Sequence, residues 1–306
     1  MKKFLLFFSL VFVFVAGCSM DSPGSGSEEE SASDTGGDEE TVIGVSISTL
    51  NNPFFVTLRD SIEEMAEEKG YSVRIVDAQD DSSKQVNDIE DLVQQDVDYL
   101  IINPTDSAAV SGSVESANSA DIPVITVDRS VDSGEVAAFI ASDNIEGGEM
   151  GAQFIVDQVG EGAQVAELEG VPGASATRER GEGFNNIASE SLDVVSNQTA
   201  NFNRAEGLDV TQNILQANPD ITAIFAHNDE MALGALEALS DQDVIVVGFD
   251  GTDDARASVE AGELDATVAQ QPDLMGETAI NTVEQLVNGE EVDSEIKVEL
   301  ELVTQE

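Results

Sequence analysis

Short, mostly apolar runs alternate with amphipathic helical segments between residues 42 and 287. A strand that is apolar at every position has to be covered on both faces, as happens when helices pack on both sides of a parallel sheet. The alternation therefore predicts an α/β fold built from doubly wound parallel sheets. The strands that we expect from it are 42–47, 73–76, 99–102, 124–127, 164–168, 192–195, 221–225, 244–247 and 266–269.

The alternation falls into two series of similar size, which meet near Asn144. A chain of 306 residues is long enough for two lobes, and a hydrophobic fraction of 41% supplies the side chains for their cores. No Ser- or Gly-rich linker divides the two series, and the short stretch 141–144 predicts a hinge instead. The sequence thus predicts two doubly wound parallel-sheet lobes joined by a hinge.

The N-terminal residues are typical of an export signal. Two lysines precede an apolar run, 4–16, which would span about 20 Å as a helix and is too short for the ~30 Å hydrocarbon core of a membrane. The run ends in Val-Ala-Gly-Cys18, which resembles the lipobox of bacterial lipoproteins. The resemblance implies that a signal peptide, residues 1–17, is removed and that the thiol of Cys18 carries a lipid. The alternative is an ordinary signal with a cysteine there by chance.

Residues 18–41 consist largely of Ser, Gly, Asp and Glu. Such a segment cannot bury enough apolar surface to offset the entropy lost on ordering, so we expect a flexible acidic lipoprotein tether. The expected protein is exported and lipid-anchored at the outer face of the cell membrane, or in the periplasm if an outer membrane is present.

The formal net charge of −50, from 62 acidic and 12 basic residues, argues against several partners. Nucleic-acid phosphates and anionic lipid surfaces both require clustered Lys and Arg, so we expect no nucleic acid and membrane contact only through the lipid. The single cysteine permits no internal disulfide, and the single histidine, His227, permits no multi-histidine metal cluster. We therefore expect neither a metal nor a cofactor.

Amides, carboxylates, guanidinium groups and phenyl rings follow the predicted strands, at the edge where open parallel sheets bind ligands. Carboxylates and amides hydrogen-bond to hydroxyls, Arg supplies a fork of donors, and phenyl faces pack against the C–H faces of a sugar ring. No Gly-rich phosphate-binding loop opens a helix in this sequence. The combination favours a neutral polyol as the ligand.

Each of these residues also has a purely structural alternative. Asn52 can cap the helix that follows it, Asp128 and Arg129 can form a surface ion pair, and Phe202 can be a core residue. Tandem phenylalanines, 54–55, weigh toward a binding role, because we expect one of the two rings to leave the core face.

Several longer stretches together resemble the ribose-binding family of bacterial ABC-importer sugar-binding proteins, which have the type I periplasmic-binding-protein fold. The resemblance extends from about residue 42 to the C-terminus. The stretches that carry it are STLNNPFF (48–55), INPTDS (102–107), PVITVDR (123–129), RERGEGF (178–184), NDEMALGAL (228–236), VGFDGT (247–252) and AQ (269–270).

The resemblance implies a ribose site between two lobes, the first formed by residues 42–142 and 271–299 and the second by 143–270 and 300–306. The sugar contacts that it implies in the first lobe are Ser48, Asn52, Phe54, Phe55, Asn103, Asp128 and Arg129. Those that it implies in the second lobe and at the hinge are Arg180, Phe202, Asn228, Phe249, Asp250 and Gln270.

The function implied is that of a monomeric substrate-binding lipoprotein that captures ribose by hinge closure and delivers it to the membrane permease of an ABC importer. Another monosaccharide (allose, xylose or a signalling furanose) and a sugar sensor coupled to a chemoreceptor stay open as alternatives. A transcription regulator with the same sensor fold needs a basic helix-turn-helix at the N-terminus, where this chain has a signal. An enzyme is not expected, because the sequence has no G-x-S-x-G elbow and His227 directly follows a predicted strand.

The excess of acid extends into the predicted lobes, for example at 63–68 and 290–291, which indicates adaptation to a salty medium. Repulsion among carboxylates destabilises a compact chain, and its range falls to about 3 Å at 1 M salt. We therefore expect the melting temperature to rise strongly from dilute buffer to molar NaCl or KCl, while the affinity for a neutral sugar changes much less. Scanning calorimetry across that range checks this, and a flat or falling melting temperature contradicts it.

Overall fold

The computed structural model describes residues 40–240 and 242–305. The predicted signal peptide, Cys18 and all of the predicted tether except Glu40 and Thr41 lie outside these residues. Within the described ranges, no helix is both long and apolar enough to cross a membrane.

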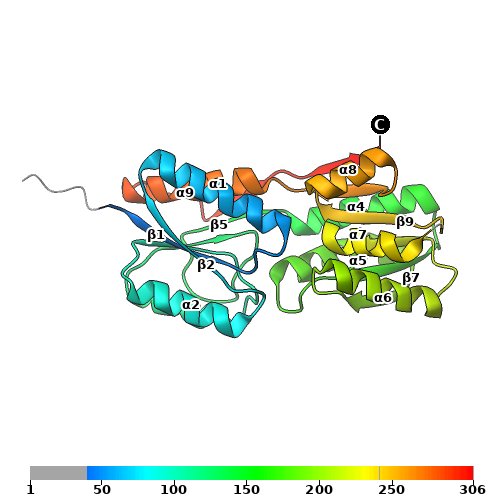
Figure 1. The fold of residues 1–306 in the computed structure, drawn as a ribbon, viewed down its shortest axis with the longest axis horizontal. Helices are drawn as coiled ribbons and strands as arrows, with labels where there is room; N and C mark the ends of the chain where they lie inside the picture. The colour runs from blue at the N-terminus through cyan, green and yellow to red at the C-terminus, as the bar shows by residue number, and fades with distance from the viewer. Residues whose placement is uncertain (1–39, 241, 306) are drawn as a thin grey trace, which may run out of the picture. The chain divides into compact units, whose positions relative to one another are not determined.

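Two six-stranded sheets form the framework of the described chain (Figure 1). The first has the order β11-β5-β4-β3-β1-β2, with β1 (Val42–Ile47), β2 (Ser72–Asp77), β3 (Tyr99–Ile102), β4 (Val124–Val127), β5 (Ala138–Ser142) and β11 (Glu295–Val298). The second has the order β12-β10-β9-β8-β6-β7, with β6 (Gln164–Glu169), β7 (Asp193–Thr199), β8 (Ala223–Ala226), β9 (Ile245–Asp250), β10 (Ala266–Ala269) and β12 (Glu301–Thr304). In the described sheets every neighbouring pair is parallel except β10 and β12, which are antiparallel.

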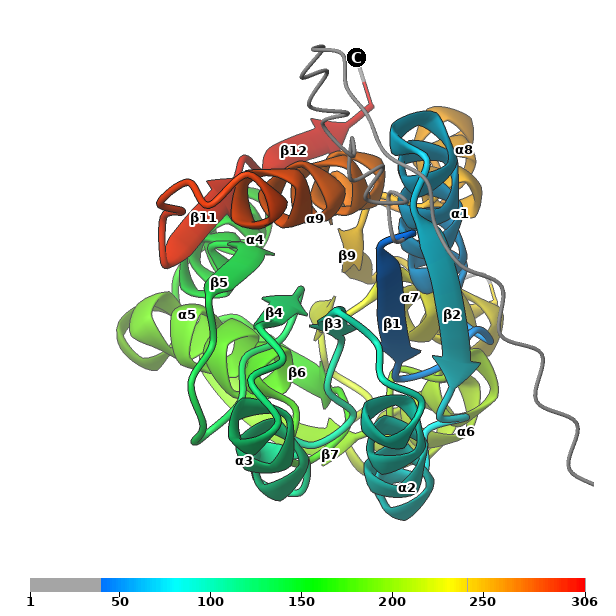
Figure 2. The same cartoon turned by 90° about the vertical axis from the view of Figure 1, so that its left-hand side faces the viewer.

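Helices cover both faces of each sheet, as the uninterrupted apolar strands predict (Figures 1 and 2). Adjacent residues of β6 show this directly, because Val165 packs into one core cluster and Ala166 into another. The helices are α1 (Pro53–Lys69), α2 (Ser82–Gln94), α3 (Ser111–Ser119), α4 (Asn144–Val159), α5 (Ser175–Ser191), α6 (Arg204–Ala217), α7 (Asp229–Leu239), α8 (Asp253–Ala261) and α9 (Pro272–Val287). The doubly wound α/β prediction is confirmed.

Helix α1 begins and ends at the residues that its sequence indicates. The Asn52 side chain accepts a hydrogen bond from the N–H of Phe54 at 2.9 Å, and Pro53 occupies the first turn. At the other end Lys69 lies in the last turn and Gly70 follows in the left-handed conformation, with φ 75°. These caps fix where the loop from β1 to α1 lies relative to the first sheet.

The chain passes between the two sheets three times. It leaves β5 of the first sheet and enters α4, which packs against the second sheet, with only Asp143 between them. It returns through residues 270–271 to α9, which packs against α1, and residues 299–300 then join β11 to β12. Short connections of this kind leave little freedom between the sheets except rotation about the connecting strands.

Some elements differ from the prediction. From its small residues the sequence predicts a helix over 108–120, but α3 begins only at Ser111, because the Asp106 carboxylate accepts from the N–H groups of Ala108 and Ala109 and holds them in a turn. β5 is a strand where the sequence indicated only a connection, and α8, β11 and β12 were not predicted. The two C-terminal strands are short, and each pairs at the edge of its sheet.

Candidate functional site

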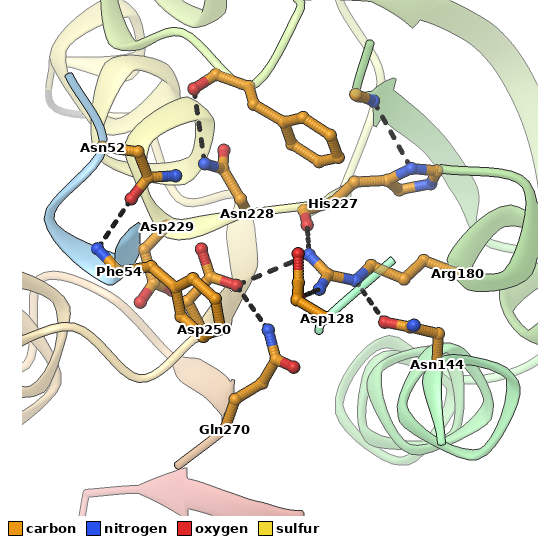
Figure 3. Close-up of polar contacts among 12 residues, drawn as sticks. Asn52, Phe54, Asp128, Asn144, Arg180, His227, Asn228, Asp229, Asp250 and Gln270 are labelled. Atoms are coloured by element: carbon orange, nitrogen blue, oxygen red, sulfur yellow. Dashed lines mark hydrogen bonds and ion pairs between the residues drawn. The ribbon is translucent and has the colours of Figure 1, made fainter. Parts of the chain in front are cut away.

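The predicted site residues gather where strands of both sheets end. Most of them follow the carboxyl ends of β1, β3 and β4 in the first sheet and of β8, β9 and β10 in the second. Helix α5 adds Arg180, and the loop between β7 and α6 adds Phe202. Figure 3 shows the polar side chains of both groups facing one another.

A small cavity of about 10 Å³ lies at the centre of this region, which is about the room that one water molecule needs. Nine of the thirteen predicted residues line it: Asn52, Phe54, Phe55, Asp128, Arg129, Arg180, Phe202, Asn228 and Asp250. A larger cavity of about 290 Å³ adjoins it, because Asn52, Phe55, Arg129 and Phe202 line both. The other four predicted residues, Ser48, Asn103, Phe249 and Gln270, do not line it.

In the first lobe, hydrogen bonds hold the Asp128 carboxylate in place. Nδ2 of Asn103 donates to Oδ2 of Asp128 at 3.2 Å, and the hydroxyl of Ser48 donates to Oδ1 of Asn103 at 2.6 Å. Asp128 has a left-handed backbone, with φ 62°, which a residue such as Asp adopts more readily than most. Ser48 and Asn103 are therefore placed to orient Asp128.

Arg129 is buried beside Asp128, which excludes the surface ion pair that the dipeptide alone permits. The side chains are 4% and 2% exposed, and Nε of Arg129 lies 3.4 Å from Oδ2 of Asp128. The Arg129 guanidinium lies between two rings, 5.0 Å from the centroid of Phe55 and 5.2 Å from that of Phe202. Burial lowers the pKa of Arg129, and the Asp128 carboxylate counteracts the shift.

In the second lobe, several neighbouring groups hold the Arg180 side chain in place (Figure 3). Its Nε donates to Oδ1 of Asn144 at 2.8 Å, and its Nη1 donates to the carbonyl oxygen of His227 at 2.6 Å. Its guanidinium lies 3.8 Å from the ring centroid of Phe249, which explains why that phenylalanine lies below the cavity and does not line it. Nη2 lies 4.0 Å from Oδ1 of Asp128 in the first lobe.

Asp250, at the end of β9, is the fourth buried ionisable side chain of the site, after Asp128, Arg129 and Arg180. Its Oδ1 accepts from Nε2 of Gln270 at 2.9 Å and lies 3.4 Å from Nη1 of Arg180. Burial raises the pKa of Asp250 to about 8, although Arg180 acts in the opposite direction. A hydrogen-bond donor entering the cavity would favour the charged carboxylate and counter this effect.

Three polar atoms of this group are buried without a hydrogen-bond partner in the described part of the chain: Oδ1 of Asp128, Nε of Arg129 and Oε1 of Gln270. Buried polar atoms are nearly always paired, and leaving one unpaired costs about 1–3 kcal/mol. The three comprise acceptors and a donor, which is what a ligand rich in hydroxyl groups requires.

The phenyl rings differ in part from the prediction. Phe54 and Phe55 are both buried and lie edge to face, with centroids 5.1 Å apart. Both belong to the hydrophobic core between the first sheet and helices α1 and α9, and both also line the cavity. The expectation that one ring must leave the core face was therefore wrong. Phe202 is half-buried, and its ring packs so closely on Gly170 that a Cβ there would lie 2.0 Å from a ring atom.

Sequence reasoning missed three supporting residues. Asn144 and His227 bind Arg180, and the buried Asp229 accepts from the N–H of Thr252 at 2.7 Å and so fixes the loop after Asp250. Burial raises the pKa of Asp229 to about 6. Their positions in the sequence could have indicated them, because each of the three lies next to the end of a strand or at the start of a helix.

The described residues contain no group of three or more His, Cys, Asp and Glu side chains arranged to hold a metal ion. Comparison with known families finds that the model of the periplasmic binding protein domain matches residues 43–291. The chain belongs to the periplasmic binding protein family.

Relatives within this family cover almost the whole chain. The ribose import binding protein RbsB of Bacillus subtilis (strain 168) is 54% identical over 100% of both chains. The protein of the same name from Escherichia coli (strain K12) is 47% identical over 86% of this chain and 90% of its own. Among solved structures, a Caulobacter myo-inositol binding protein bound to myo-inositol is 34% identical, with a TM-score of 0.82 over 86% of this chain and 93% of its own.

Proposed function

We propose that this periplasmic binding protein is the extracytoplasmic substrate-binding component of an ABC sugar importer and that it binds ribose between its two lobes. The observation that carries the proposal is a cavity bordered by phenyl rings and lined by Asp128 and Arg129, each of which has a buried atom without a hydrogen-bond partner. Gln270, which donates to Asp250 of the cavity wall, has a third such atom. The full-length similarity to ribose import binding proteins supports ribose over other polyols.

The residue types suit both the hydroxyl groups and the C–H faces of a sugar. Carboxylates of Asp128 and Asp250 accept from sugar hydroxyls, and the guanidinium groups of Arg129 and Arg180 donate to sugar oxygens. Phenyl rings cover the C–H faces and exclude water. An epimer leaves at least one buried group unpaired, at about 1–3 kcal/mol each, so the site discriminates between hydroxyl configurations. The function is binding and not catalysis.

We propose that the lobes separate to admit the sugar, because the central cavity between them has room for only about one water molecule. Contacts across the cleft have to break in that motion: the N–H of Ser107 donates to the carbonyl of Gly173 at 3.1 Å, and the N–H of Ser130 donates to Oγ of Ser175 at 2.9 Å. We propose that the three connections between the sheets are the hinge and that they separate a first lobe, 42–142 with 271–299, from a second, 143–270 with 300–306. The sugar stabilises closure because only the closed form contacts it from both sides.

The first test is a calorimetric titration of the purified protein with ribose, allose and xylose, combined with small-angle scattering. We expect one ribose to bind per chain and the radius of gyration to fall, because closure brings the lobes together. Heat with allose or xylose but none with ribose contradicts the assignment of the sugar. A radius of gyration that does not change on saturation contradicts hinge closure.

The second test replaces a single carboxylate. Asp128→Ala removes the acceptor that faces both Arg129 and the sugar, and we expect the affinity for ribose to fall by at least roughly 100-fold. Asp88→Ala is the matched control, because it also removes a carboxylate that pairs with a cation, Lys84 at 2.6 Å, but lines neither cavity. Equal affinities for the two variants would show that Asp128 takes no part in binding.

The proposal includes export and a lipid anchor at Cys18, from which the acidic segment 18–41 would tether the lobes near a permease. Wild-type protein should therefore partition with membranes, and Cys18→Ala should not, because the thiol is the site of lipid attachment. Membrane fractionation and mass spectrometry of the mature N-terminus check this. A wild-type protein that is released with Ser19 or a later residue first contradicts the anchor.

A chemoreceptor in place of a permease, or beside it, is the second candidate role, because a closed sugar-bound form suits both partners. Capture of membrane proteins by the ribose-bound chain distinguishes the sensory role from the transport role, because the captured protein is then identified as a receptor or as a permease. Recovery of a permease alone contradicts the sensory role.

A further inference from the structure

The single histidine of the sequence is buried against a carboxylate behind Arg180. Nε2 of His227 lies 2.9 Å from Oε1 of Glu167, and Oε2 of Glu167 accepts from Nδ2 of Asn197 at 2.6 Å. The N–H of Gly170 points at Nδ1 of His227 at 3.4 Å. Because Nδ1 accepts, the ring hydrogen of the neutral imidazole lies on Nε2 and is donated to Glu167.

This pair fixes the end of one strand to its neighbour. Glu167 belongs to β6, and His227 directly follows β8, which pairs with β6 in parallel. The N–H of His227 donates to the carbonyl of Leu168 at 3.0 Å, so both the main chain and the ring of His227 are tied to β6. The carbonyl of His227 consequently has little freedom to turn.

That carbonyl is the acceptor for Nη1 of Arg180 at 2.6 Å (Figure 3). The pair also supports the helix that carries Arg180. A Cβ on the next residue, Gly181, would lie 3.3 Å from Oε1 of Glu167 and 3.4 Å from Cε1 of His227, so α5 packs directly on the two side chains. Asn144 holds Nε of Arg180 from the opposite side.

We propose that His227 and Glu167 are positioning residues for Arg180 and set the affinity of the site without lining it. The inference rests on the proposed function, because it assigns Arg180 to the sugar site. If the pair moves, the carbonyl of His227 turns, and one of the acceptors that hold the guanidinium at the cavity is lost. Asn228, which does line the cavity, follows His227 in the chain and shifts with it.

The decisive comparison is between His227→Phe and His227→Gln in the full-length protein. The phenylalanine keeps the ring volume but loses both hydrogen bonds, and we expect the affinity for ribose to fall roughly 10-fold to 100-fold. The glutamine amide still donates to Glu167, so we expect it to restore the affinity to within about threefold of wild type. Titration calorimetry measures both.

Asp265→Ala is the matched control for lost stability. The Asp265 carboxylate accepts from the N–H of Val246 at 2.8 Å, at the opposite end of the strands from the site. We expect this variant to melt at a lower temperature and to keep wild-type affinity.

If His227→Phe does not fold, the double variant Glu167→Leu with His227→Phe replaces the pair by apolar groups and leaves no buried charge unpaired. This double variant should show the same loss of affinity.

A readout without sugar separates this proposal from the proposed function. In nuclear magnetic resonance spectra, the Nη–H signals of Arg180, assigned by their absence in Arg180→Lys, should exchange with water faster in His227→Phe and return to the wild-type rate in His227→Gln. If wild-type protein binds no ribose, the proposed function fails and this exchange rate alone decides the positioning role. Wild-type affinity and exchange in His227→Phe, with melting lowered as in Asp265→Ala, would overturn the proposal.

Discussion

Four ionisable side chains, buried where the two lobes meet, constrain the rest of this structure. Asp128, Arg129, Arg180 and Asp250 are each at most 5% exposed, and two acids face two bases. Removing charges from water costs several kcal/mol per ion unless each is paired and hydrogen-bonded, so every one of the four requires support. The carboxyl ends of parallel strands supply that support, because they bring side chains from separate parts of the chain to one edge.

The support is complete for some of these groups and incomplete for others. Arg180 is held by Asn144 and the carbonyl of His227, whereas Asp128 and Arg129 each keep one buried atom without a hydrogen-bond partner in the described residues. Full pairing within the protein would give a more stable but inert cluster. A site that keeps a few atoms without hydrogen-bond partners until a ligand binds gains those hydrogen bonds on binding. They contribute to the affinity, and they favour the ligand whose hydroxyl groups match the site.

The fold was predictable because central strands such as β3 and β8 are apolar at every position, and the N-terminal cap of α1 could be placed at Asn52. The thirteen residues that the family resemblance implied do converge, nine of them on one cavity. Periodicity could not predict β11 and β12, because four-residue edge strands depend on pairing with distant parts of the chain. Nor could it show that Phe54 and Phe55 both pack on the core while bordering the cavity, or that His227 lies beneath Arg180, since these are properties of packing.

The central claim is that ribose satisfies the unpaired atoms of the buried charged group. A crystal structure of the protein with ribose tests it most directly. We expect one sugar in the cleft, with oxygen atoms within about 2.6–3.2 Å of Oδ1 of Asp128, Nε of Arg129 and Oε1 of Gln270, and phenyl rings against its C–H faces. A sugar bound elsewhere, or one in the cleft that leaves these three atoms unpaired, would contradict the account.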